Sequence, residues 1–164
     1  DLRLTPVVAD ASALPNTLLA RPFDAILADV PCSATGVMRR NPDIKILRKF
    51  GDIAGFANQQ LAILTGLWPA LKPGGRLLYV TCSLLAAEND EVVSQFAARH
   101  SAHIDAVKLG TGTPRQHGWQ TLPERHGGDG LYFARLRKPT EYHSNPSTNV
   151  SNPHGVAGFT WFKV

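Results

Sequence analysis

Two cysteines are the residues of this sequence whose type and position best suit covalent chemistry. The chain of 164 residues contains only Cys32, in "DVPCSATG", and Cys82, in "YVTCS", and each follows an apolar run. Two carboxylates are similarly placed, because Asp10 and Asp29 also come at the ends of apolar runs. In an open α/β sheet, ligands bind outside the carboxyl ends of the strands. The sequence therefore predicts that these thiols and carboxylates line one site.

The possible uses of the two cysteines differ in the spacing that they require. A free cysteine most often packs as a small buried hydrophobic residue, and this interpretation stays open for each one alone. A zinc site needs close Cys or His pairs, and neither a CxxC nor an HxxxH pair is present, which also argues against a redox pair. A phosphatase loop needs an Arg where Met38 stands. The remaining use is a thiolate nucleophile that a second thiol assists.

A pyrimidine ring gives such a nucleophile a purpose. Its C5 atom accepts a methyl group only after a thiolate has added at C6 and made the ring an enamine. A base must then remove the C5 proton so that the thiolate can leave. Two thiols and a carboxylate supply the groups that these steps need.

The elements that would position these residues alternate between strands and helices. We predict parallel strands at Val7–Ser12 and Asp24–Val30, the second buried on both faces. Apolar residues at helical spacing between residues 52 and 71 predict a helix that ends at "LKPGG". The run "RLLYVT", residues 76–81, predicts another buried strand. This order predicts an α/β sheet.

The later part of the chain continues the pattern. The segment "AAENDEVVSQFAARH" predicts a helix, and its acidic residues Glu88, Asp90 and Glu91 suit a positive helix N-terminus. The segments "AHIDAVKL" and "DGLYFARL" predict antiparallel closing strands. After residue 138 the composition becomes rich in Pro, Asn, Ser and Thr. We therefore predict a domain at residues 1–138 and a polar tail at residues 139–164.

Composition and charge limit the class of protein. Hydrophobic residues make up 43% of the chain and charged residues 18%, which is typical of a globular protein. The net charge of +4 and the pI near 9.3 are compatible with a polyanionic partner such as RNA. No apolar stretch is long enough to cross a membrane. We expect a cytoplasmic protein with reduced thiols and no membrane partner.

Taken together, the motifs resemble those of the RNA (cytosine-C5)-methyltransferases of the RsmB/Nop2/Sun family, from about Val7 to Arg137. The family's Asp-x-Pro-Cys motif matches "DVPC", and its late Asp-Gly element matches "DGLYFARL". Its Thr-Cys motif matches the "TCS" that follows "LKPGGRLLYV", where the following Glu88 and Asn89 also fit. The resemblance implies an α/β fold, the Rossmann-like sheet of class I S-adenosylmethionine-dependent methyltransferases.

The resemblance also implies roles for individual residues. Cys82 is the expected nucleophile, and Cys32 is expected to assist release of the product. Asp29 should orient the cofactor and the target base, Pro31 belongs to the same cofactor-binding motif, and Asp10 matches the carboxylate that recognises the adenine end of S-adenosylmethionine. No metal ion is expected.

A basic run follows the Pro-Cys loop. We expect Arg39, Arg40 and Lys45 to contact RNA phosphates, because a target base must be extruded into the pocket while its backbone is held. A charged face that is merely solvated is the alternative.

Two parts of the family's pattern have no counterpart in the sequence. These are the glycine-rich loop after the first strand and the acidic residue after the second. We therefore expect an N-terminally truncated sheet that binds S-adenosylmethionine weakly or not at all on its own. Exposed sheet edges would then favour self-association.

The sequence as a whole predicts methyl transfer from S-adenosylmethionine to C5 of a cytosine in RNA, with ribosomal RNA as the expected substrate. Two alternatives stay open. One is a non-catalytic RNA-binding module that has lost its cofactor. The other is a DNA cytosine-C5 methyltransferase, in which Cys32 would be the nucleophile.

Overall fold

A mixed β-sheet with two long helices on one face forms the part of the chain that the structure describes. The computed structural model describes residues 5–124 and 127–140, together with the backbone of residues 159–163. The elements in chain order are α1 (Asn16–Leu19), β1 (Phe23–Asp29), η1 (Thr35–Val37), α2 (Ile44–Leu47), α3 (Asp52–Leu67), η2 (Trp68–Ala70), β2 (Leu71–Thr81), η3 (Ala86–Glu88), α4 (Asp90–His100), β3 (His103–Asp105), β4 (Thr113–Pro114), β5 (Trp119–Gln120), β6 (Tyr132–Arg137) and β7 (Phe159–Lys163).

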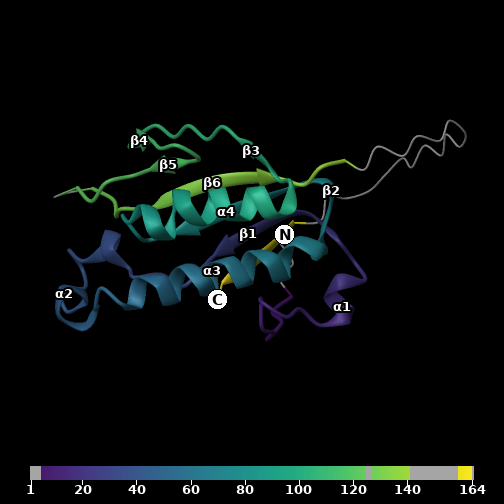
Figure 1. Cartoon of the computed structure of the whole chain (residues 1–164), viewed down its shortest axis with the longest axis horizontal. Helices are drawn as coiled ribbons and strands as arrows, with labels where there is room; N and C mark the ends of the chain where they lie inside the picture. Colours follow the sequence, from purple (N-terminus) through teal and green to yellow (C-terminus); the bar gives the residue numbers. More distant parts are fainter. Residues whose placement is uncertain (1–4, 125–126, 141–158, 164) are drawn as a thin grey trace, which may run out of the picture.

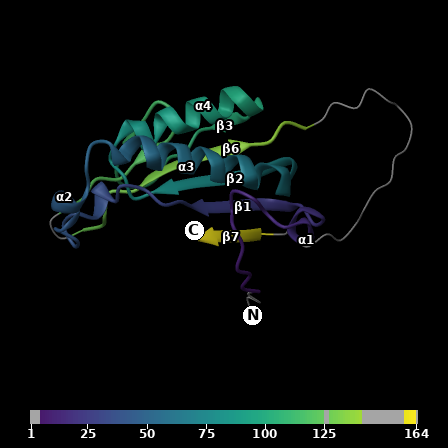
Figure 2. The ribbon, with the colours of Figure 1, turned by 60° about the horizontal axis from the view of Figure 1, so that its bottom comes forward.

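The sheet has the strand order β4-β5-β6-β2-β1-β7, and β3 also pairs with β6. Strands β1 and β2 are parallel, so a crossover must join them, and α3 supplies it. Figure 1 and Figure 2 show that β1, β2 and β7 point the same way, while β6 runs against β2. The predicted α/β sheet is confirmed.

Helix α3 forms where the apolar spacing predicts it. Its buried face includes Ile63, Leu64 and Leu67, which recur at helical spacing. Asp52 stands in the first turn, where a carboxylate interacts favourably with the helix dipole. The helix ends just before Trp68, whose ring packs edge-on against Phe96 of α4 at a centroid distance of 5.1 Å. This aromatic contact joins the two long helices over the sheet.

Burial of β1 on both faces was predicted, and this is wrong. Helices α3 and α4 lie on the same face of the sheet (Figure 2), and Ile26 and Ala28 are buried in one core cluster with residues of these helices. Residues that alternate with them, such as Ala25 and Leu27, are only half-buried. In the described part of the chain the pattern is therefore that of a sheet with one covered face.

The strand predicted at Val7–Ser12 is also wrong. The segment has no strand, and Val7 and Val8 are exposed. At the end of this segment the Asp10 carboxylate accepts hydrogen bonds from the backbone N–H and the hydroxyl of Ser12. These bonds stabilise a turn, and the segment does not pair with the sheet as a strand would. The edge of β1 that a further parallel strand would need is paired with β7.

Strand β2 begins five residues before the predicted start at Arg76 and includes "LKPGG". Gly74 has a φ of +75°, as a turn residue would. Its N–H nevertheless donates to the carbonyl of Lys138 at 2.9 Å, and the N–H of Lys138 donates to the carbonyl of Gly75 at 3.0 Å. These bonds keep the turn aligned with the sheet.

The late strands pair as predicted, because β3 and β6 are antiparallel. The loop between them also contains β4 and β5, which extend the sheet beyond β6 and were not predicted. Residues 141–158 of the predicted tail lie outside the described residues. Residues 159–163 form β7, which lies along the edge of β1 that we had expected to be open.

Candidate active site

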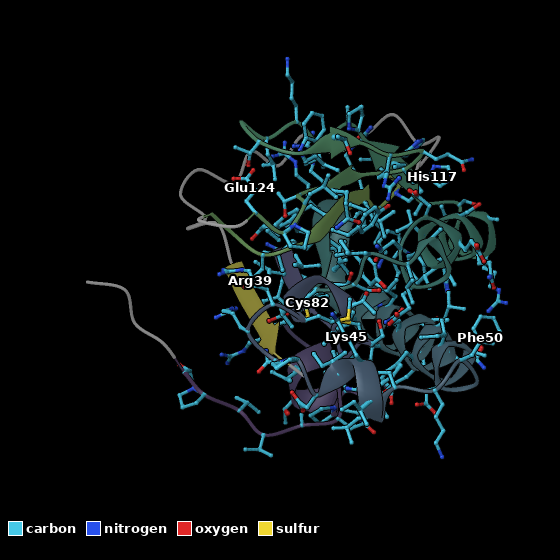
Figure 3. The ribbon with its side chains drawn as sticks, turned by 90° about the vertical axis from the view of Figure 1, so that its left-hand side faces the viewer. Arg39, Lys45, Phe50, Cys82, His117 and Glu124 are labelled. Atoms are coloured by element: carbon cyan, nitrogen blue, oxygen red, sulfur yellow. The ribbon has the colours of Figure 1, made fainter. Side chains whose placement is uncertain are left out.

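The parallel pairing of β1 and β2 brings the two cysteines together. Asp29, the last residue of β1, lies opposite Val80, and the N–H of Val30 donates to the carbonyl of Val80 at 3.2 Å. The two strands therefore finish at the same end of the sheet, the end that carries their carboxyl termini. Just beyond it, the sulfur atoms of Cys32 and Cys82 lie 3.3 Å apart. Figure 3 views the molecule from this side, with Cys82 between Arg39 and Lys45.

The two thiols differ in their tendency to ionise. Cys32 is buried, whereas Cys82 is partly exposed, so a negative charge is better placed on Cys82. The hydrogen bond with Cys32 lowers the pKa of Cys82 to about 7, against the opposing effects of burial and of the Asp29 and Glu88 carboxylates. The same hydrogen bond, with burial, raises the pKa of Cys32 far above its ordinary value. Near neutral pH, Cys82 is therefore the more readily ionised of the two thiols, and Cys32 keeps its proton.

A buried carboxylate connects the loops that follow the two strands. One oxygen of Glu88 accepts the backbone N–H of Ser33 at 2.7 Å, and the other accepts the hydroxyl of Ser83 at 2.8 Å. The side-chain amide of Gln60, on α3, donates to Glu88 at 3.2 Å and to the carbonyl of Pro31 at 2.9 Å. Each cysteine is thus next to a residue that Glu88 binds.

Glycines join the late Asp-Gly element to this site. The N–H of Gly36 donates to the carbonyl of Cys82 at 2.8 Å, and the N–H of Gly130 donates to the carbonyl of Gly36 at 2.9 Å. A Cβ atom on Gly36 would lie 1.9 Å from the Gly130 oxygen. The close approach of three backbone segments therefore requires glycine at position 36.

A second set of buried hydrogen bonds holds the Thr-Cys loop in place. The hydroxyl of Thr81 donates to the side-chain oxygen of Asn89 at 2.6 Å, and the amide of Asn89 donates to the carbonyl of Ser83 at 2.9 Å and to Gln120 at 3.2 Å. The hydroxyl of Tyr79 reaches the carbonyl of Glu88 at 2.6 Å. All these side chains are buried.

Sequence reasoning gave these supporting residues no role in the site, although Glu88 and Asn89 fit the family's pattern after the Thr-Cys motif. Glu88 was assigned to a helix N-terminus, but α4 begins at Asp90 and the Glu88 side chain turns into the site. Asp90 and Glu91 do lie in the first turn of α4, as predicted. Gln60 could have been found, because it shares the buried face of α3 with apolar residues, and a buried amide needs hydrogen-bond partners.

The predicted RNA-binding cations are exposed at the same end of the molecule. Arg40 forms an ion pair with Asp129, and its Nε donates to that carboxylate at 3.1 Å. Arg39 reaches the carbonyl of Gly127 at 3.4 Å, and Lys45 is exposed on α2. Farther along, the Nε of Arg48 donates to the carbonyl of Ser33 at 3.1 Å, which ties the basic segment to the Pro-Cys loop.

The structure places Asp10 away from the other predicted site residues. A Cβ atom on Gly66, near the C-terminus of α3, would lie 2.4 Å from the carbonyl oxygen of Ser12. The turn at Asp10 therefore packs at the end of α3 that precedes β2. The cysteines lie toward the other end, because Arg48, just before α3 begins, donates to the carbonyl of Ser33, the residue after Cys32. Figure 1 shows the two ends of α3. The hydrogen bonds from Ser12 hold the pKa of the Asp10 carboxyl below its ordinary value.

The described residues provide neither a metal centre nor a membrane-spanning helix. No group of three or more His, Cys, Asp or Glu side chains is arranged to hold a metal ion. No helix there has the length and apolar character needed to span a membrane.

Solved structures share this fold and define its class. NSun6 from Pyrococcus horikoshii, solved with SFG, is 30% identical, with a TM-score of 0.69 over 82% of this chain and 34% of that one. A methyltransferase homolog protein from the same organism is 27% identical, with a TM-score of 0.60 over 75% of this chain and 41% of that one. The sheet, with two thiols at its carboxyl edge, is a Rossmann-like methyltransferase sheet.

Sequence comparisons identify the family within that class. The family described as 16S rRNA methyltransferase RsmB/F matches residues 2–137, and the chain belongs to it. Ribosomal RNA small subunit methyltransferase B of Erwinia tasmaniensis is 54% identical over 116 residues, and that of Serratia proteamaculans is 53% identical over the same length. The match covers 71% of this chain but only 26% of either relative.

Proposed function

We propose that the chain carries the thiol chemistry of methyl transfer from S-adenosylmethionine to C5 of a cytosine in RNA, with ribosomal RNA as the substrate. The observation that best supports this function is the 3.3 Å contact between the sulfur atoms of Cys32 and Cys82, which lowers the pKa of Cys82 and raises that of Cys32. Membership of an rRNA methyltransferase family supports the choice of substrate.

In this reaction the Cys82 thiolate forms a bond to C6 of the cytosine, and the electron pair moves toward C5. S-adenosylmethionine supplies the methyl group that C5 takes up. A base then removes the C5 proton, and the electrons of that C–H bond return to the ring and expel the Cys82 thiolate. Asp29, at the end of β1, is placed to orient the reacting base.

The thiol contact gives Cys32 a role that changes during the reaction. While Cys82 is a thiolate, its negative charge and hydrogen bond keep the proton on Cys32. Once Cys82 is bonded to C6, that charge is gone and the pKa of Cys32 falls. Cys32 then loses its proton to water, and the resulting thiolate accepts the C5 proton, so that Cys32 is a thiol again when the product is released.

The described residues fit only part of S-adenosylmethionine. The half-buried Asp29 carboxylate and the adjacent Pro31 would face its polar end, whereas for Asp10 the role at the adenine stays a prediction, since its turn lies at the other end of α3. Two cavities of about 340 and 350 Å³ are lined by other residues, around Asp90 and around Leu78. A related protein solved with SFG, an S-adenosylmethionine analogue, supports use of this donor. We expect weak binding by this chain alone, which calorimetric titration measures.

The proposed RNA contacts are Arg39, Arg40 and Lys45. All three are exposed, and Figure 3 shows Arg39 and Lys45 at the end of the molecule that carries Cys82, which suits phosphate binding. Each lost phosphate contact should lower the salt dependence of RNA affinity by a log–log slope of about 0.7. Lys45→Ala should therefore weaken binding and flatten this dependence, whereas Lys108→Ala, an exposed lysine beyond β3, should change neither. Equal effects of both variants would contradict the proposed interface.

The decisive experiment is covalent capture with RNA that contains 5-fluorocytosine, because fluorine at C5 cannot leave as a proton and the adduct persists. In the intact enzyme with S-adenosylmethionine present, the expected result is capture that is lost in Cys82→Ala and kept in Cys32→Ala. Capture that depends on Cys32 instead would assign the nucleophile as in DNA cytosine methyltransferases. RNA binding without any capture would make the chain a binding module.

A further inference from the structure

Glu88 is the only carboxylate for which the described hydrogen bonds join the Pro-Cys and Thr-Cys loops. Its side chain is fully buried, with a relative exposure of 0%. Its two oxygens are divided between the loops, since Oε2 accepts the Ser33 N–H and Oε1 accepts the Ser83 hydroxyl. Ser33 directly follows Cys32 and Ser83 directly follows Cys82. A single side chain therefore holds the backbone next to both thiols.

Burying a carboxylate costs free energy unless hydrogen-bond donors surround it. Here the donors come from three elements, because Gln60 on α3 donates to Oε2 as well, at 3.2 Å. The Ser83 hydroxyl is further fixed by the N–H of Leu85, at 3.1 Å, and by contact with the Ser33 hydroxyl at 3.2 Å. The contacts converge on the residues beside the thiols.

We infer that Glu88 is a positioning residue for the methyl transfer, which sets the separation of the Cys32 and Cys82 sulfur atoms by fixing the two loops that carry them. The role in catalysis depends on the proposed function. The role in the thiol contact does not, and it is measured in the absence of RNA and S-adenosylmethionine.

The pKa of Cys82 reports the thiol contact directly. The groups that act on it are the Cys32 thiol, which lowers it, and the carboxylates of Asp29 and Glu88, which raise it by their charge. The hydrogen bond from Cys32 is the largest of these effects and the charge of Glu88 is smaller. Loss of positioning and loss of charge therefore shift the pKa of Cys82 in opposite directions.

Two substitutions separate these effects. Glu88→Ala removes the contacts to both loops, and we expect the pKa of Cys82 to rise from about 7 by about one unit or more. In Glu88→Gln the side-chain oxygen can still accept the Ser33 N–H, and the side-chain N–H can donate to the Ser83 hydroxyl oxygen. The contacts to both loops are then kept, so the pKa of Cys82 should stay near 7 or fall slightly. Glu91→Gln is the matched control, because Glu91 is exposed in the next turn and touches neither loop.

The measurement is the rate of thiol alkylation as a function of pH, on variants whose near-ultraviolet circular dichroism matches that of the native chain. A fall of the pKa in Glu88→Ala would mean that Glu88 acts through its charge alone, and an unchanged pKa would mean that it has no influence; either overturns the inference. If Glu88→Ala does not fold, Ser83→Ala removes one contact and should still raise the pKa.

The reaction itself provides the second readout. In the intact enzyme, Glu88→Ala should lower kcat for methyl transfer about fivefold at pH 7 and leave RNA affinity unchanged, because a rise of about one unit in the pKa of Cys82 lowers its thiolate fraction from about one half to about one tenth. Glu88→Gln should retain most of the activity. If no methyl transfer occurs even with the native residues, the proposed function fails, whereas the shift in the Cys82 pKa still decides the positioning role.

Discussion

Replacing Cys32 with alanine removes the hydrogen-bond donor 3.3 Å from the Cys82 sulfur and changes how fast Cys82 attacks a disulfide. With the donor present the pKa of Cys82 is about 7, and without it the pKa should return toward the reference value of 9.0. At pH 7 the thiolate fraction then falls from about one half to about one hundredth, a loss of about fiftyfold.

Part of this loss is recovered, because a more basic thiolate is a better nucleophile. With a Brønsted coefficient of about 0.45, an increase of about two pKa units makes the ionised sulfur about eight times more reactive. The net expectation for Cys32→Ala at pH 7 is therefore a rate about six times lower. Well above pH 9.0, where both proteins are ionised, the variant should react faster than the native chain.

The assay is the initial rate of thione release from 4,4′-dithiodipyridine across a pH series that spans both pKa values. Cys32→Ser is the matched control, because its hydroxyl can donate to the Cys82 thiolate and should keep the midpoint well below that of the alanine variant. The reasoning is refuted if Cys32→Ala titrates with the same midpoint as the native chain, or if its rate is lower at every pH.

Three other predictions concern the fold around the site. Gly36→Ala should lower the free energy of unfolding in urea by about 1–3 kcal/mol, because its Cβ would meet the Gly130 oxygen. Gly55→Ala is the control and should not lower it, because no atom outside the neighbouring backbone of its own helix lies within 4 Å of the added carbon. Mild oxidation with diamide should convert Cys32 and Cys82 to an intramolecular disulfide that dithiothreitol reverses, seen by mass spectrometry, since the sulfurs need to approach only from 3.3 Å to about 2.05 Å. The folded state lowers the pKa of Cys82, so ionisation adds stability that is complete above the unfolded pKa and is lost as pH falls through about 7. The urea midpoint should therefore rise between about pH 7 and pH 9.0 more in the native chain than in Cys82→Ala, and parallel curves would contradict this.

The sequence predicts the elements that local pattern determines. The helical spacing of apolar residues located α3, and the apolar runs before the cysteines located β1 and the second half of β2. It also predicts that Asp29, Cys32 and Cys82 lie at one edge, because parallel strands end on the same side of a sheet. Local pattern does not determine which strands pair with each other. For that reason Val7–Ser12 was wrongly assigned as a strand.

Long-range polar contacts were equally inaccessible to the sequence. Glu88 stands among other acidic residues before a helix, where the helix dipole gives a sufficient local explanation for all of them. Its actual partner Ser33 is 55 residues away, and only the folded chain brings the two together. The alternation of buried and half-buried residues in β1 likewise depends on which face α3 and α4 cover.

Because of the parallel register of β1 and β2, the contact between the two thiols forms only in the completely folded chain. Cys32 and Cys82 are separated by 50 residues, so their contact exists only after the α3 crossover has closed and the two strands have paired. A slip of one residue would displace a strand by about 3.3 Å and turn its side chains to the other face, and the sulfurs would part. A chain arrested before this step carries two ordinary thiols, mostly protonated at neutral pH. The reactive sulfur is thus made by the finished fold, and chains still folding are protected from its chemistry.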